Sequence, residues 1–92
     1  MLAKTRTAVG VLVLPNLELL VRFADGKIKK YNVKNLAKKI KAFKQLERNK
    51  KLFSKVQVGF GGDALVWNED IDLDSREIYK NGLDVTKNIM KG

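Results

Sequence analysis

The spacing of apolar residues changes near residue 34, and this change most constrains the fold of the chain. Over residues 9–13 and 17–23, apolar side chains recur at every second position, the period of a half-buried strand. From residue 34 to 48 they recur every three or four positions, the period of an amphipathic helix. Strand-like alternation returns over residues 56–74. Strands, a helix and further strands, joined by short turns, predict an α+β domain.

Turn residues divide the first part into three strands. A β-branched run ends at Pro15-Asn16, and Asp25-Gly26 supplies the dipeptide typical of a tight hairpin. The third strand has broken alternation, because Ile28 and Tyr31 fall on opposite faces. A bulge and a fraying edge strand are the two alternatives for it.

The rest of the chain completes a β-β-β-α-β-β order with a short C-terminal helix. We expect an antiparallel sheet with one face covered by the helix over residues 36–46, because parallel units need longer crossovers than this chain offers. The alternation of Val56, Val58 and Phe60 predicts a fourth strand. We expect a single domain over residues 1–82 and a C-terminal tail over residues 83–92 whose order the sequence does not define.

The amino-acid composition excludes several common catalytic and metal-binding residues. The 92 residues include no Cys and no His, so disulfides, thiolate nucleophiles and the commonest zinc ligand are excluded. No apolar run reaches the roughly 18 residues of a membrane span, and no signal-peptide cleavage site is present. We therefore expect a cytoplasmic, non-enzymatic protein without cofactor or metal and without membrane association.

Positive charge is concentrated in one part of the chain. The net charge is +9, from 19 Lys and Arg against 10 Asp and Glu, and Glu47 is the only acidic residue between positions 27 and 55. On a continuous helix, five cationic residues would form one arc opposite the apolar stripe. These candidate binding residues are Lys34, Lys38, Lys41, Lys44 and Arg48.

Three interpretations of this basic arc stay open. It would increase the association rate with an acidic protein partner, or it would neutralise nucleic-acid phosphates without sequence preference. It would also serve simply as a solvated surface, and the scarcity of arginine favours this over phosphate recognition. The oligomeric state is not defined by the sequence.

Three other motifs have simpler interpretations. The glycines of residues 59–62 lie between two strands, not at a helix start, so a hairpin turn is favoured over a phosphate loop. The acidic run over residues 69–74 resembles a calcium loop but has Ser75 and Asn81 where glycine and glutamate are needed. Its carboxylates also lack a nucleophile or a partner for acid–base catalysis. The aromatic residues, Phe60 among them, are expected in the core, and a base-stacking surface would require them exposed beside the lysines.

The order of several motifs resembles a known bacterial family. They are Leu19-Leu-Val-Arg-Phe23-x-Asp25-Gly26, Phe43-x-x-Leu46, Leu52-Phe53-x-x-Val56, a glycine pair, Val66-Trp67, Asp72-Leu73 and Tyr79. Over residues 8–82 the chain is similar to the domain-of-unknown-function family 2442. The resemblance implies a small α+β domain with no assigned activity. Some members carry an added helix-turn-helix domain, and others lie beside a small gene in arrangements like toxin–antitoxin pairs. It therefore implies an interaction module, antitoxin-like or regulatory, whereas the lysine density of this chain departs from the family.

Overall fold

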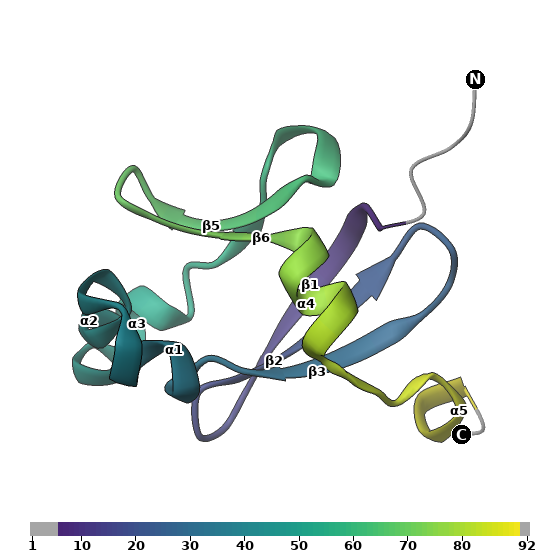
Figure 1. The fold of residues 1–92 in the computed structure, drawn as a ribbon, viewed down its shortest axis with the longest axis horizontal. Coiled ribbons are helices and arrows are strands. Elements are labelled where there is room, and N and C mark those ends of the chain that lie inside the picture. Colours follow the sequence, from purple (N-terminus) through teal and green to yellow (C-terminus); the bar gives the residue numbers. More distant parts are fainter. Residues whose placement is uncertain (1–5, 91–92) are drawn as a thin grey trace.

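The computed structural model describes residues 6–90, and its antiparallel sheets and helices confirm the α+β class (Figure 1). The strands are β1 (Ala8–Leu14), β2 (Glu18–Phe23), β3 (Ile28–Asn32), β4 (Gln57–Val58), β5 (Ala64–Asn68), β6 (Ile71–Asp74) and β7 (Leu83–Asp84). The α-helices are α1 (Lys34–Lys39), α2 (Lys44–Arg48), α3 (Lys50–Phe53), α4 (Ser75–Asn81) and α5 (Thr86–Met90). The 3₁₀ helices are η1 (Lys41–Phe43) and η2 (Phe60–Gly62).

The strands form two antiparallel sheets instead of the single sheet that the sequence predicts. The first sheet has the order β1-β2-β3-β7, and the second sheet has the order β4-β5-β6. The second sheet and α4 lie on one side of the first sheet (Figure 1). The core between them contains fully buried Leu19 and Phe23 from β2, Leu65 from β5 and Ile78 from α4. The inner face of the first sheet is thus covered by a second sheet as well as by helices.

The Asp25-Gly26 hairpin forms as predicted. Gly26 has a φ of 92°, a conformation that glycine adopts without steric cost. The Phe23 amide donates to the Lys27 carbonyl at 2.8 Å, and the Asp25 carboxylate accepts from the Lys27 amide at 2.9 Å. Side chain and backbone together therefore fix the register of β2 and β3.

The third strand is neither bulged nor at an edge, so both alternatives for its broken alternation are wrong. Its register with β2 is continuous, and β7 pairs with its other side. Ile28 is buried on the outer face because the chain after β7 packs there. The Val85 amide donates to the Ile28 carbonyl, and the Ile28 amide donates to the Thr86 hydroxyl, both at 2.9 Å. The apolar residues of β3 lie on opposite faces because separate segments cover each face.

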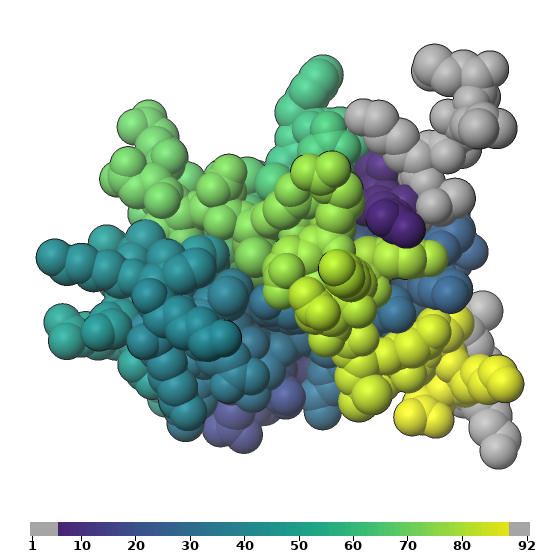
Figure 2. All heavy atoms as spheres, in the orientation of Figure 1, coloured from purple at the N-terminus to yellow at the C-terminus, as the bar shows by residue number. Residues whose placement is uncertain are grey.

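The prediction that Phe60 continues a fourth strand into the core is also wrong. β4 ends at Val58, and Phe60 is fully exposed on a turn. The chain turns there because Gly61 and Gly62 adopt φ values of 78° and 76°. The buried Ser75 hydroxyl donates to the Gly62 carbonyl at 2.8 Å, so the turn is fixed to the start of α4. In Figure 2 this segment projects from the top of the molecule.

Candidate functional site

The five residues predicted to bind a partner all lie exposed on consecutive short helices. Lys34 and Lys38 are on α1, Lys41 is on η1, and Lys44 and Arg48 are on α2. Their exposure follows from the pattern of this segment, in which Ala37, Phe43 and Leu46 are the buried residues.

The continuous helix expected over this segment is wrong, because the chain breaks at Ile40. Ile40 has an extended backbone (φ −117°, ψ 117°) and its side chain is 44% exposed, although helical spacing places it within the apolar stripe. The cationic residues of the predicted arc are three or four positions apart, a spacing at which like charges destabilise a helix by a few tenths of a kcal/mol per pair. The break separates Lys38 from Lys41, so the five residues do not form one arc.

Trp67 explains why the broken helix is stable. On β5 it contacts Phe43 edge-on, with ring centroids 5.9 Å apart, and stacks on Phe53 at 6.3 Å. The indole N–H donates to the Phe53 carbonyl at 3.1 Å. A straight helix of residues 34–48 would run for about 22 Å and carry its C-terminal end away from this ring. Because the chain turns back at Ile40, Phe43 and Phe53 both pack against the Trp67 ring. This burial of aromatic side chains offsets the helical hydrogen bonds that are lost at the break.

A second break at Asn49 extends the positively charged surface. The Asn49 side chain accepts from the Leu52 amide at 3.1 Å and so caps α3. We use the name basic segment for the nine exposed cationic residues between positions 34 and 55, where Glu47 is the one acidic residue. They are Lys34, Lys38, Lys39, Lys41, Lys44, Arg48, Lys50, Lys51 and Lys55. Figure 2 shows this segment, in blue-green, at the left end of the molecule. The turn between β5 and β6 lies at the same end in Figure 1.

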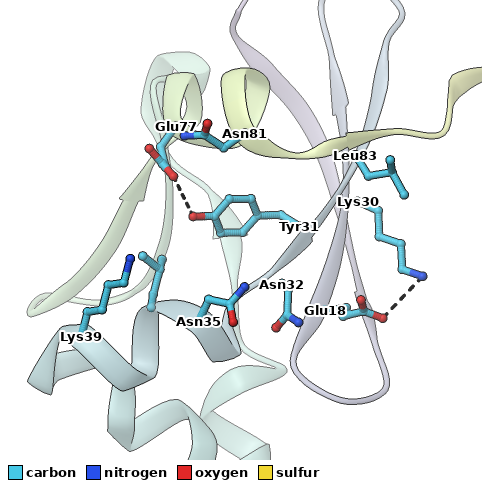
Figure 3. A pocket seen from close by; sticks show the side chains of 10 residues that line it. Glu18, Lys30, Tyr31, Asn32, Asn35, Lys39, Glu77, Asn81 and Leu83 are labelled. Carbon is cyan, nitrogen blue, oxygen red and sulfur yellow. Dashed lines mark hydrogen bonds and ion pairs between the residues drawn. The ribbon is translucent and has the colours of Figure 1, made fainter.

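A polar hollow that the sequence did not predict lies beside the basic segment (Figure 3). It has a volume of about 410 Å³ and lies where β7 ends, next to the last β3–β7 pair, Lys30 with Leu83. Tyr31 points across it and donates from its hydroxyl to the Glu77 carboxylate at 2.9 Å. Asn35 and Lys39 line it from α1, so the hollow and the basic segment share one residue, Lys39. Tyr31 and Glu77 are 46 positions apart in the sequence, so tertiary packing brings them together and no local sequence pattern predicts the contact.

The Tyr31 side chain is held in its neutral form. Burial raises the pKa of Tyr31 well above its ordinary value, and the hydrogen bond to the Glu77 carboxylate raises it further. Ionisation would place a phenolate next to a carboxylate. The hydrogen bond between Tyr31 and Glu77 holds α4 against β3. Because its pKa is raised, the Tyr31 hydroxyl stays protonated near neutral pH and does not act as a base there.

We expect Tyr31→Phe to be less stable than the wild type by about 1 kcal/mol below pH 10, with the difference shrinking at higher pH. Because the folded-state pKa of Tyr31 is raised, the stabilisation is complete below the unfolded-state pKa of 10.0 and is lost as the pH rises toward the folded-state pKa. Urea unfolding of the wild type and the variant across this pH range would measure the difference in stability. Both proteins contain the same lysines, so the effect of lysine titration on stability cancels in the comparison. A difference that grows above pH 10 would contradict the assignment.

A second tyrosine connects α4 to the β2–β3 hairpin. The Tyr79 hydroxyl donates to Asp25 at 2.6 Å, which raises the pKa of Tyr79. Desolvation would raise the pKa of Asp25, but hydrogen bonds from Tyr79 and the Lys27 amide outweigh it, so this pKa is lowered. The guanidinium of Arg6 and the ammonium of Lys29 lie 5.6 and 5.2 Å from the Tyr79 ring centroid. These contacts give the charges around Tyr79 a structural role.

Asp74, the last residue of the acidic run over residues 69–74, has a local structural role. The Asp74 carboxylate accepts from the Arg76 amide at 2.8 Å, caps α4 and pairs with the Arg76 guanidinium at 2.9 Å. The hydrogen bonds and charge of Arg76 lower the pKa of Asp74. Within residues 6–90, no three acidic side chains lie close enough together to hold a metal ion. No helix in the described part of the chain is long and apolar enough to cross a membrane.

A family model matches most of the chain. The model of the family described as "Protein of unknown function (DUF2442)" matches residues 8–83, nearly the range of the resemblance. Neither the curated proteins nor the solved structures contain a match to the chain.

Proposed function

The chain belongs to the DUF2442 family, whose description assigns no activity, and we propose that it is a non-enzymatic interaction module that binds an acidic protein partner through the basic segment. The observation that carries this proposal is the density of exposed charge, nine cationic side chains against Glu47 over residues 34–55. Such a surface raises the rate at which an acidic partner associates and orients it during the encounter. The role we propose is antitoxin-like or regulatory, in the cytoplasm, with the product of a neighbouring gene as the first partner to test.

The arrangement of the basic segment supports a protein partner over a phosphate backbone. Arg48 is its single arginine, and arginine is the residue that binds phosphates in a bidentate manner. Eight of the nine cationic residues lie on short helices with backbone breaks at Ile40 and Asn49, so they do not follow one groove or one helix face. A folded acidic surface accommodates such an irregular set of point charges.

Reversing three charges in the basic segment is expected to weaken association with that partner about 10- to 100-fold. The variant is Lys38→Glu, Lys41→Glu and Lys44→Glu, all exposed, so the fold should be retained. Co-expression with the neighbouring gene's product and titration of the purified pair would measure the affinity. The matched control, Arg22→Glu with Lys80→Glu and Lys87→Glu, makes the same change in net charge outside the basic segment and should bind within threefold of the wild type.

Nonspecific nucleic-acid binding through the same residues is the alternative function. It predicts that filter binding to duplex DNA or RNA weakens linearly with the logarithm of salt concentration, by a slope of about −0.9 per phosphate neutralised on duplex DNA. The charge-reversed variant would lose this binding and the control would keep it. Binding to nucleic acid with no binding to the protein partner would replace our proposal with this alternative. If neither probe binds at low salt, both functions are excluded for these probes.

A further inference from the structure

The polar hollow at Tyr31 is lined by two helices, each of which contributes one amide and one charged side chain (Figure 3). Asn35 and Lys39 are four positions apart on α1. Glu77 and Asn81 have the same spacing on α4. Residues at this spacing share one face of a helix. α1 therefore brings an ammonium group to the hollow, and α4 brings a carboxylate group.

These two opposite charges do not neutralise each other. Among residues 6–90, Lys39 and Glu77 form no ion pair with each other or with any other side chain. The Tyr31 hydroxyl donates to Oε2 of Glu77, and Oε1 accepts no hydrogen bond from a described residue. The side-chain amides of Asn35 and Asn81 also have no partner in this part of the chain. A cation, an anion and two amides are thus available to a ligand.

The charge balance of the hollow restricts the class of that ligand. Its lining contains two lysines and two glutamates, so it is neutral although the chain carries +9. Lys30 and Glu18 already pair, with 3.5 Å between Nζ and Oε1, which leaves Lys39 and Glu77 to be matched. A purely anionic ligand, such as a phosphate, would be repelled by Glu77, and a purely cationic ligand by Lys39. A ligand that carries both charges satisfies both side chains.

The Glu77 carboxylate is held in place, and the hollow has the size of a small-molecule site. Tyr31 is 7% exposed, and its hydrogen bond at 2.9 Å fixes the carboxylate. A side chain that is already ordered loses little conformational entropy when a ligand binds. The volume of about 410 Å³ lies within the ~300–1,000 Å³ of small-molecule sites. Leu36 and Leu83 contribute apolar lining beside these polar groups.

We propose that this hollow binds a free α-amino acid, with the ligand's carboxylate toward Lys39 and its ammonium group toward Glu77. Both charges of the ligand have to fit within one hollow, which favours a free amino acid over a peptide, whose terminal charges lie at opposite ends. The amides of Asn35 and Asn81 can donate to the carboxylate or accept from the ammonium group. Because Asn35, Lys39 and Asn81 are themselves exposed, binding is weak, with a dissociation constant on the order of 1 mM.

Titration of the isotopically labelled, purified chain with each of the common amino acids, to about 10 mM, tests this proposal. At least one of them should saturate with a dissociation constant on the order of 1 mM. The largest amide shift changes should fall within residues 31–39 and 77–83, which include the hollow between the helices. The N-acetylated form of that amino acid lacks the ammonium group, and its carboxamide form lacks the carboxylate. Each should bind more weakly by about tenfold or more.

Two variants and one control assign the binding to the facing charges. Lys39→Gln and Glu77→Gln each remove one charge and should weaken binding by about tenfold or more. Lys38→Gln makes the same charge change at the neighbouring position of α1, which does not line the hollow, and should bind within about twofold of the wild type. Lys39 is exposed, so Lys39→Gln should retain the fold even if Glu77→Gln weakens the contact with Tyr31.

Several results would overturn the proposal. They are the absence of saturable binding of any amino acid by about 10 mM, equal binding of a blocked form, and wild-type affinity in Lys39→Gln. A loss in Lys38→Gln equal to that in Lys39→Gln would also overturn it, as would shift changes that fall outside residues 31–39 and 77–83. All of these measurements use the chain without a protein partner, so their failure is distinguishable from a failure of the proposed function.

Discussion

Replacing Gly62 with alanine should cost about 3 kcal/mol or more of the free energy of unfolding, a large part of the 5–15 kcal/mol typical of a domain. Gly62 is buried with a φ of 76°, so a side chain there is strained before any contact is considered. The added Cβ would also overlap the Thr7 methyl group and lie 2.5 Å from the Ala8 carbonyl oxygen. Because Ala8 is buried at the start of β1, the first sheet would have to move.

Gly61 provides a matched control for this prediction. It has nearly the same φ, 78°, but the nearest atom to an added Cβ is an Asp63 carboxylate oxygen at 3.8 Å. Gly61→Ala should therefore cost only the conformational strain, about 1 kcal/mol. Urea unfolding followed by circular dichroism measures both variants. Equal losses would show that the packing of the turn against β1 contributes nothing.

Trp67→Ala should destabilise the protein by about 3–5 kcal/mol, because it removes a large buried side chain and leaves a cavity. The loss should be greatest in the helical segment, since Phe43 and Phe53 both pack on this ring. Amide exchange in α1, α2 and α3 should accelerate more than in β1 and β2.

Phe60→Ala is the control for Trp67→Ala. It also truncates an aromatic side chain of the second-sheet region, but Phe60 is fully exposed and should change the unfolding free energy by less than about 0.5 kcal/mol. A similar loss in both variants would contradict the assignment of Trp67 to the core that supports the basic segment.

Local signals in the sequence predicted much of the fold. The Asp25-Gly26 hairpin follows from turn chemistry that requires a positive φ at Gly26, and it forms where expected. The predicted short C-terminal helix also forms, as α4 (Ser75–Asn81), and the structure shows Asp74 as its cap. Both features depend on residues that are close together in the chain.

The errors arose where distant segments decide the structure. Ile28 is buried because residues 83–86 pack beside it, and Ile40 is exposed because the helix turns back toward Trp67. One local signal was present: the lysine spacing that predicted a single arc also places like charges where they destabilise a continuous helix. The exposure of Phe60 had a local signal as well, since glycines lie on both sides of it.

The candidate site was predicted in composition but not in shape. All five cationic residues are exposed, yet they lie on three short elements. The hollow at Tyr31 was not predicted, because Glu77 approaches from an element 46 positions away. Charge can be counted from a sequence, whereas the hollow depends on where β7 ends along β3.

Amide chemical shifts of the labelled protein, recorded as the neighbouring gene's product is added, identify the residues that bind this partner. If the basic segment binds it, the largest shift changes fall within residues 34–55 and shrink as salt is raised. Changes confined to the outer face of the first sheet or to the hollow at Tyr31, with residues 34–55 unaffected, would contradict it.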